Sequence, residues 1–415
     1  MSRTLKIQFK ALLPVAGEVI ENGELLIEQG RIQEVSRRQT GSSPIDSLDL
    51  SDHLLVPGFV NAHCHLSLSA LHDKVPKLEK FTDWVRALLN ENIKLPWDER
   101  VRAVQTGALQ LSGSGVTTLA DILSQPELLP EYAALPFRQV QFLEVLGFKQ
   151  NRVQEILARV TTIFNSQNPK GHLLQLGLAP HAPYSVSPVL FRELKKLAGR
   201  YDCPFTCHVA EFFEEERFLK EGGGELQEFL EERGVFDDDW QPPGKSPVRY
   251  LDEIGALDSM VGVHLNHIAD DLGLLAARNA SAVFCPGSTR WFGRTRFMPV
   301  RKLLDAGVKV GLGSDSLASN ESLNFLRELR IADEMLPDVS RSEILKMATA
   351  GGASALGLST GALVPGMSAD LIGFRVQENP NAWTDVPFDP GRERVDFSMV
   401  AGNVVHGKQN IKNEQ

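Results

Sequence analysis

His63 and His65 stand one residue apart in PGFVNAHCH, at the end of an apolar run in this 415-residue chain. Alternate side chains of a β-strand point the same way, so both imidazoles would face one side and Cys64 the other. One strand could therefore deliver two ligands to one metal ion. The same pair also fits two ordinary histidines at a strand end, so the interpretation depends on the rest of the chain.

Three further polar residues follow later strand-like runs. His208 lies near the end of PFTCHVA, His264 lies in MVGVHL, and Asp315 follows VKVGLGS. Imidazoles together with a carboxylate suit Zn²⁺ or Fe²⁺. These residues strengthen the metal interpretation, because all of them would meet where the strands end.

Other residues near these strand ends have candidate roles. Glu211, three residues past His208, could carry protons between a metal-bound water and a substrate, whereas Glu214–Glu216 are expected to be solvated surface residues. His264 is expected to face the site and His267 to be structural, because His264 is nearer the strand end. His181, after the fourth strand, is a candidate for substrate contact. Cys64 and Cys207 are expected to be packing residues that point outward.

The elements that must position these residues alternate between short apolar runs and longer helical patterns. Helical patterns cover 81–93, 186–200 and 341–357, among others. Strands that alternate with helices indicate a parallel sheet, and eight of them indicate an α/β fold of the (β/α)8 barrel type with its site at the strand carboxyl ends. The eight strand candidates are 54–62, 116–122, 137–147, 172–180, 204–210, 260–265, 281–286 and 308–314.

Both ends of the chain contain short β-prone runs and differ from the middle. GELLIEQGRIQEVSRR near the start resembles in type the runs 371–376 and 397–405, and a Ser- and Asp-rich stretch at 40–52 is expected to be a loop. We expect a small β-sandwich domain built from residues 1–53 and 361–415 around a catalytic barrel at 54–360.

The bulk properties exclude several classes of function. The net charge of −10 and the pI of about 5.6 argue against binding to nucleic acid or an anionic membrane surface, and no run is long enough to span a bilayer. The four cysteines form no CxxC pair, and no convincing signal peptide begins the chain. We expect a cytoplasmic protein with a small-molecule substrate, and a homodimer is one option for its oligomeric state.

The motifs PGFVNAHCHLSLSAL, HVAE, VHLNH and GLGSDSLASN occur in this order at the predicted strand ends. Together they resemble the amidohydrolase superfamily, and within it the branch of cytosine deaminases and chlorohydrolases. The resemblance implies one divalent metal, Zn²⁺ first and Fe²⁺ as the alternative. It implies that Glu211 shuttles protons and that His264 assists the water and holds the oxyanion or leaving-group region. The implied metal ligands are His63, His65, His208 and Asp315.

Many members of the superfamily hold two metals bridged by a carboxylated lysine after the fourth strand. Here that place has the sequence LGLAPHAPYS, and the nearest lysines, Lys170 and Lys195, are far from the strand end. One metal is therefore expected.

These roles predict hydrolytic deamination of an aminated ring. The metal would lower the pKa of its bound water from 15.7 to about 7. Asp315, as ligand and base, and His264 would orient that water, and Glu211 would protonate a ring nitrogen of the substrate. Ammonia would leave, and a carbonyl would replace the ring amine.

The substrate is suggested by a narrower resemblance. The segments 68–89 and 284–323 resemble aminodeoxyfutalosine deaminases, which the resemblance links to menaquinone synthesis, and deaminases of S-adenosylhomocysteine or methylthioadenosine are close relatives. The loop GSTRWFGRTRF could offer Trp291 for stacking on a purine and arginines for a carboxylate. The chain departs from the subgroup at Ser67, where Glu is usual, and at Thr289, where His is frequent. The predicted substrate-binding residues are His181, Arg290, Trp291 and Arg294.

The sequence leaves two other functions open. One is dechlorination of a triazine-like ring, which would release chloride in place of ammonia. The other is a non-enzymatic scaffold, as found among relatives that have lost their metal ligands. This chain retains all four implied ligands together with Glu211 and His264, which favours an enzyme.

Overall fold

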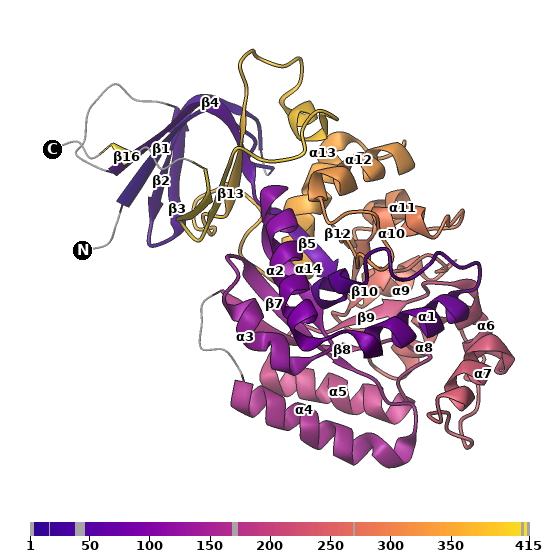
Figure 1. Cartoon of the computed structure of the whole chain (residues 1–415). Helices are drawn as coiled ribbons and strands as arrows, with labels where there is room; N and C mark the ends of the chain where they lie inside the picture. Colours follow the sequence, from indigo (N-terminus) through magenta and orange to yellow (C-terminus); the bar gives the residue numbers. More distant parts are fainter. Residues whose placement is uncertain are drawn as a thin grey trace.

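The computed structural model describes residues 4–15, 17–37, 46–167, 173–268, 270–407 and 411–412. Eight parallel strands in the order β8-β7-β6-β5-β12-β11-β10-β9 form the central sheet, and a bridge between Leu178 and Phe205 closes it into a barrel (Figure 1). The predicted (β/α)8 barrel is therefore confirmed. Its strands are β5 (Phe59–Cys64), β6 (Val116–Leu123), β7 (Arg138–Val145), β8 (Leu174–Pro180), β9 (Thr206–Val209), β10 (Val261–His264), β11 (Ser281–Phe284) and β12 (Lys309–Leu312).

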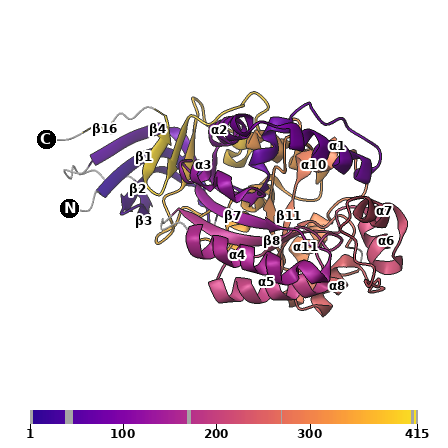
Figure 2. The same cartoon turned by 60° about the horizontal axis from the view of Figure 1, so that its bottom comes forward.

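Helices cover the outside of the barrel, and Figure 2 shows α4 and α5 side by side near β8. The three predicted helical patterns are helical, although the last is divided into α13, a π-helical turn at Met347–Gly351 and α14. The helices are α1 (Phe81–Lys94), α2 (Trp97–Gly113), α3 (Leu129–Ala133), α4 (Val153–Gln167), α5 (Pro188–Tyr201), α6 (Phe213–Glu221), α7 (Gly224–Glu232), α8 (Pro247–Glu253), α9 (Leu272–Ala277), α10 (Pro286–Trp291), α11 (Val300–Asp305), α12 (Phe325–Met335), α13 (Arg341–Lys346) and α14 (Gly352–Ala355).

Local sequence explains where these helices begin and end, and α5 is an example. The Ser187 hydroxyl accepts a hydrogen bond from the main-chain N–H of Leu190, and Pro188 occupies the first turn, where no N–H is needed. Asp202 ends the helix with a left-handed φ of 48°. A capping box between Ser340 and Glu343 begins α13 in the same way.

The two ends of the chain form a second sheet of eight strands beside the barrel, as expected. Its order is β15-β14-β13-β4-β1-β2-β3, with β16 also paired to β4, and all pairs are antiparallel except β1 with β4. Ile7, Leu25 and Phe397 belong to its separate apolar core. The strands are β1 (Thr4–Leu12), β2 (Ile20–Glu28), β3 (Arg31–Arg37), β4 (Asp46–Pro57), β13 (Leu371–Arg375), β14 (Phe397–Val400), β15 (Asn403–His406) and β16 (Ile411–Lys412).

Two local expectations near the domain junction are wrong. Residues 46–52 of the predicted loop at 40–52 form the first half of β4, because buried Leu48 and Leu50 alternate with exposed Asp49 despite the Ser-rich composition, whereas residues 40–45 lie outside the described part of the chain. The predicted single strand 54–62 is two strands separated by Gly58, whose Cα approaches Thr117 so closely that a Cβ would lie 2.0 Å from its hydroxyl oxygen. The boundaries 1–53, 54–360 and 361–415 stay a prediction. Within the described residues, no helix is long and apolar enough to cross a membrane.

Candidate active site at the strand carboxyl ends

The carboxyl end of β5 and the segment after β12 place three of the predicted metal ligands together. The Nε2 atoms of His63 and His65 lie 3.7 and 3.9 Å from Oδ1 of Asp315. The main-chain N–H groups of Ser314 and Asp315 both donate to the carbonyl of His63, which fixes this approach. Gly313 permits it, because a Cβ there would lie 2.9 Å from Cβ of His63.

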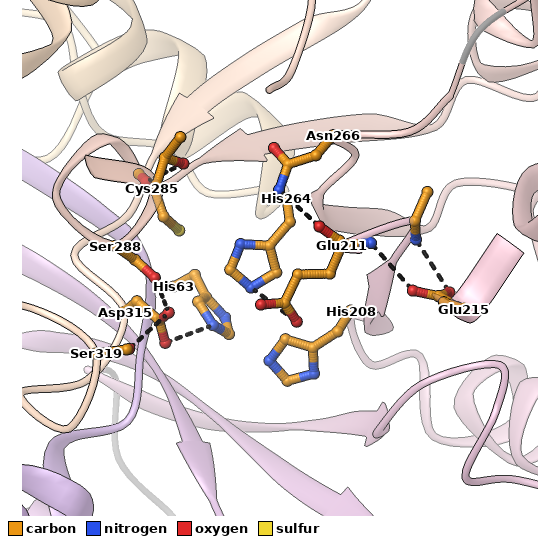
Figure 3. A network of polar contacts seen from close by, with 12 residues as sticks. His63, His208, Glu211, Glu215, His264, Asn266, Cys285, Ser288, Asp315 and Ser319 are labelled. Carbon is orange, nitrogen blue, oxygen red and sulfur yellow. Dashed lines mark hydrogen bonds and ion pairs between the residues drawn. The ribbon is translucent and has the colours of Figure 1, made fainter. Parts of the chain in front are cut away.

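His208 and His264 come from the ends of β9 and β10 and face the same point (Figure 3). Nε2 of His208 lies 3.2 Å from Nε2 of His65, and Nδ1 of His208 lies 2.9 Å from the main-chain oxygen of His181. Because a carbonyl can only accept, Nδ1 of His208 carries the proton and Nε2 is left with a free lone pair. The ring of His264 stacks on that of His208, with centroids 5.6 Å apart.

These histidines and Asp315 fit a divalent metal. Two groups, His63 with His208 and His264, and His63 with His65 and Asp315, each have potential ligand atoms within 4.8 Å of one another. Nε2 of His63 is buried and has no hydrogen-bond partner among the described residues. Such an orphaned nitrogen is costly unless a metal ion or another group satisfies it.

Burial also keeps the candidate ligands in the protonation state that a metal needs. It lowers the pKa of His63 to about 4 and the pKa values of His65 and His264 to about 3, so all three are neutral at pH 7. Burial alone would raise the pKa of Asp315. The close approach of His63, whose Nε2 lies 3.7 Å away, and the charge interactions with the imidazoles outweigh burial and hold this pKa well below its usual value.

The backbone is strained at three of these strand ends. Ala210, His264 and Asp315 have φ values of +50°, +71° and +57°, a region that residues other than glycine seldom occupy. Strain of this kind costs of order 1–3 kcal/mol per residue and is typical of functional sites. The fold therefore holds Glu211, His264 and Asp315 in place at a cost in stability.

Glu211 follows Ala210 and lies at the inner end of the site. Its Oε2 is 3.8 Å from Nε2 of His264, and its side chain is almost fully buried. Burial raises the pKa of Glu211, and the positive charge of Arg294 opposes this effect. The carboxyl group is thus placed to gain and lose a proton next to the candidate metal ligands.

A cavity of about 610 Å³ opens from this cluster towards the surface. His65, His208, Glu211, His264 and Asp315 line its inner end, together with His181. Towards the surface, the walls are mostly apolar side chains of α1 and of the end of α7. The two helices are joined by hydrogen bonds from Thr82 to Glu225 and from Arg86 to Glu232. The outer wall includes Phe81, Trp84, Val85, Leu88, Leu89, Phe229, Leu230 and Val235.

The structure does not bring Arg290 or Trp291 to this cavity. Arg290 extends from α10 to the surface and pairs with Glu334 of α12 at 2.5 Å. Trp291 packs edge-on against Trp84 and lines a separate cavity of about 250 Å³. Arg294 contacts Glu211 and is likewise not part of the cavity wall. Of the predicted substrate-binding residues, the cavity contains His181 alone.

The two departures from the subgroup pattern are also away from the cavity. Ser67 is buried in the turn Leu66–Leu71, and the Thr289 hydroxyl donates to the main-chain oxygen of Cys285 at 2.8 Å.

The two lysines nearest to the fourth strand in sequence are Lys170 and Lys195. Lys195 donates to the main-chain oxygen of Asp258 and lies over the ring of Phe205, whereas Lys170 lies outside the described residues.

Sequence reasoning missed several residues that hold the site together. The expectation that Glu215 is a solvated surface residue is wrong: it is fully buried and accepts the main-chain N–H groups of Ala210 and Glu211, both at 3.0 Å. Its position three and four residues before buried Phe218 and Leu219 on α6 is the helical signal that could have revealed this burial. Ser288 and Ser319 both donate to Oδ2 of Asp315, and no motif pointed to them.

A closed parallel barrel with histidines and an aspartate at the carboxyl ends of its strands is typical of enzymes with a metal-binding active site. A model of the amidohydrolase family matches residues 54–405, and this protein belongs to that family. The family uses a divalent metal, and the predicted superfamily is confirmed. So is the enzyme class, a hydrolase acting on carbon–nitrogen bonds other than peptide bonds.

Individual relatives are similar along most of the chain. A 5-methylthioadenosine/S-adenosylhomocysteine deaminase of Pyrococcus furiosus is 31% identical over 381 residues, covering 85% of this chain and 82% of that protein. The structure of Helicobacter pylori aminofutalosine deaminase with methylthio-coformycin has a TM-score of 0.83 at 22% identity, covering 97% of this chain and 100% of that one. Zinc-bound atrazine chlorohydrolase from Arthrobacter aurescens has a TM-score of 0.82 at 20% identity, covering 97% and 95%. The two structural likenesses show the shared fold alone.

Proposed function

We propose that this protein is a Zn²⁺-dependent deaminase of a 6-aminopurine nucleoside that carries an extended 5′ group, with aminodeoxyfutalosine as the first candidate. The observation that carries the proposal is the shape of the main cavity. Its inner end holds the polar cluster with Glu211, and an apolar channel connects that end to a basic rim. A role in menaquinone synthesis, a cytoplasmic location and a homodimer stay predictions.

His63, His65, His208 and Asp315 would hold the metal in this proposal, with Fe²⁺ as the alternative ion. A bound divalent ion supplies Lewis acidity, which makes a water molecule a competent nucleophile near neutral pH. The lone pair of His208 Nε2 and the orphaned Nε2 of His63 suit such an ion. The number of ions per chain is proposed to be one.

Glu211 and His264 would then handle protons and orient the reactants. The Glu211 carboxylate would take a proton from the attacking water and pass it to a ring nitrogen, which makes the adjacent carbon electrophilic. It would later help to deliver a proton to the departing amine, so that ammonia leaves and a carbonyl remains. His264 is neutral at pH 7 and lies 3.8 Å from Glu211, where it can hold the developing oxyanion or the water.

The outer half of the cavity suits a long substituent on the nucleoside. Phe81, Trp84 and Phe292 line it and offer aromatic faces, with Phe81 stacked on Phe212 at 3.9 Å between ring centroids. A purine with a small 5′ group would leave much of a 610 Å³ cavity unfilled. An extended apolar or aromatic 5′ group would fill it and displace water from the walls.

The rim of the cavity carries positive charges that could meet an anionic end of the substrate. Lys149, Arg152, Arg159 and Arg233 all line the cavity. Arg152 is paired with Glu155, whereas neither Arg159 nor Arg233 forms an ion pair with any described residue. Guanidinium groups bind carboxylates through paired hydrogen bonds. These rim residues replace Arg290 and Arg294 as the proposed carboxylate contacts.

The similarity to the 31% identical deaminase of 5-methylthioadenosine and S-adenosylhomocysteine supports an adenosine-type substrate. It equally supports those two compounds as alternatives to aminodeoxyfutalosine. Triazine dechlorination is a weaker alternative, because the chlorohydrolase likeness, at 20% identity, extends to the fold alone.

The proposal is tested by steady-state kinetics of ammonia release on a matched substrate series. The series comprises adenine, adenosine, methylthioadenosine, S-adenosylhomocysteine and aminodeoxyfutalosine, with cytosine, guanine and a chlorotriazine as outside comparisons. We expect kcat/KM to rise with the length of the 5′ group and to be highest for a carboxylate-bearing member. A higher kcat/KM for any outside compound would overturn the substrate class.

A variant at the rim of the cavity tests whether the enzyme recognises the charge of the substrate or only a long 5′ group that fills the channel. Arg159→Ala is expected to raise KM for the carboxylate-bearing substrates and to leave methylthioadenosine unchanged. Arg200→Ala is the matched control, because Arg200 is exposed on the neighbouring helix α5 and does not line the cavity. An equal effect of Arg159→Ala on both kinds of substrate would contradict the assignment of the rim.

A further inference from the structure

We propose that Arg294 is a positioning residue that holds the Glu211 carboxylate in its catalytic orientation, and that it is not a contact for the substrate. The proposal rests on the proposed function in one respect, because it takes Glu211 as the proton carrier. The sequence of the loop GSTRWFGRTRF suggested that Arg294 binds a substrate carboxylate. In the present proposal, Arg294 binds Glu211 instead.

Two hydrogen bonds join the guanidinium of Arg294 to Glu211. Nη2 donates to Oε1 of the carboxylate at 2.8 Å, and Nη1 donates to the main-chain oxygen of the same residue at 2.6 Å. One planar group thus binds both the side chain and the backbone of Glu211, which fixes the torsions between them. Oε2 remains unbound by Arg294 and is the oxygen that faces His264.

Arg294 is itself held in place before any substrate arrives. Its guanidinium lies over the ring of Phe292, with 4.7 Å from the central carbon to the ring centroid, and its side chain is 13% exposed. Its main-chain N–H donates to the carbonyl of Thr289 in α10. Phe292 in turn packs edge-on against Trp84 at 5.0 Å. The arginine is therefore preorganised and loses little side-chain freedom when it binds Glu211.

Asn266 and Glu215, which belong to other elements, hold the backbone of Glu211 in place. Asn266 donates from Nδ2 to the Glu211 carbonyl at 3.0 Å and accepts the N–H of Met298, at the end of the loop that carries Arg294. Glu215 accepts the N–H of Glu211 from the opposite side (Figure 3). These bonds fix the backbone of Glu211. Arg294 therefore determines the side-chain torsion angles that orient its carboxylate.

Recognition of a substrate carboxylate by Arg294 would compete with these contacts. Both of its terminal nitrogens bind Glu211, and the residue does not line the main cavity. A substrate anion would have to break the ion pair with Glu211 and move the proton carrier. The cavity instead offers Arg159 and Arg233, which form no ion pair with described residues.

The test compares Arg294→Met, Arg294→Lys and Glu211→Gln with the wild-type enzyme on two substrates. Methylthioadenosine has a neutral 5′ group, and S-adenosylhomocysteine carries a carboxylate. For Arg294→Met we expect kcat to fall about 100-fold on both substrates, because misplacing a catalytic group by about 1 Å can cost 10²-fold. KM should change by less than about 3-fold, and Arg294→Lys should recover part of kcat because its ammonium can still reach Oε1. Arg296→Met is the control, because Arg296 is exposed two residues further along the same loop.

Crystal structures of the wild type and of Arg294→Met provide a readout that does not depend on turnover. We expect the Glu211 carboxylate to rotate or to occupy several conformers in the variant while the main chain of residues 208–215 stays in place. An unmoved, fully ordered carboxylate would overturn the proposal. So would wild-type kcat in Arg294→Met, or a rise in KM confined to S-adenosylhomocysteine. If Glu211→Gln keeps wild-type activity, the proposed function of Glu211 fails instead, and the crystallographic comparison still decides whether Arg294 positions it.

Discussion

Ser288 donates a hydrogen bond of 2.6 Å to Oδ2 of Asp315, and Ser319 donates to the same oxygen at 3.1 Å. The other carboxylate oxygen, Oδ1, faces His63 and His65. The two serines therefore fix the carboxylate so that one oxygen is anchored in the protein and the other is free for a metal. Outer contacts of this kind orient metal ligands and tune their affinity.

Replacing Ser288 by alanine should weaken metal binding without removing a ligand. Loss of an outer-sphere partner typically costs about 10–100-fold in metal affinity. Competition with a chromophoric chelator would measure the change. Ser342→Ala, on the exposed face of α13, should retain wild-type affinity. Equal affinities for Ser288→Ala and the wild type would show that Ser319 alone suffices to hold Asp315.

Metal content should be one divalent ion per chain, and His63→Ala should abolish it. His63 belongs to both groups of clustered ligand atoms, so its loss leaves neither group complete. Elemental analysis of purified protein measures the stoichiometry, and a thermal scan should show a lower Tm after chelation, because an ion that binds only the folded state stabilises it. Two ions per chain in the wild type would contradict the single-metal proposal.

Glu211→Gln should reduce kcat by about 10²–10⁴-fold, the usual contribution of a general acid–base group. Metal content should stay near that of the wild type, because Glu211 lies beyond the proposed ligand His208 and belongs to neither group of clustered potential ligand atoms. The matched control is Glu221→Gln at the exposed end of α6. Loss of the metal in Glu211→Gln would instead identify this residue as a ligand.

Asp121 should make stability depend on pH. This carboxyl group on β6 is fully buried, and one of its oxygens accepts the N–H of Leu66 at 2.7 Å. Burial raises its pKa from 3.8 to about 7. Between these two values the folded state keeps a proton that the unfolded state has lost, so stability falls as pH rises through this window.

The size of this effect is of the order of a few kcal/mol, since each pKa unit corresponds to about 1.4 kcal/mol. Asp121→Asn keeps an acceptor for Leu66 and removes the titration. Urea unfolding of metal-loaded protein at pH 5 and at pH 7 should show a smaller loss of stability in the variant than in the wild type. Equal losses would assign the pH dependence to other buried carboxyl groups, such as Glu328, whose pKa burial also raises to about 7.

The barrel and its polar strand ends could be predicted from sequence because both follow from local periodicity. Alternation along a strand decides that His63 and His65 share a side, and parallel strands in a barrel bring their carboxyl ends together whatever lies between them. His208, His264 and Asp315 could therefore be placed at the same site as His63. This holds although Asp315 lies more than 200 residues from His63 along the chain. The first half of β4 was missed because Ser and Asp residues concealed its buried Leu48 and Leu50.

Tertiary packing alone decided how other side chains, such as Arg294 and Glu215, support that site. Arg294 and Glu211 are 83 residues apart, and whether the arginine binds a substrate or the glutamate depends on how α10 and its loop pack beside β9. Burial of Glu215 depends in the same way on the face that α6 turns inward. The cavity walls come from α1, α7 and the β7–α4 segment, which meet only in the folded chain. Local sequence fixes the direction of a side chain relative to its own strand or helix, whereas its partner is set by contacts between distant elements.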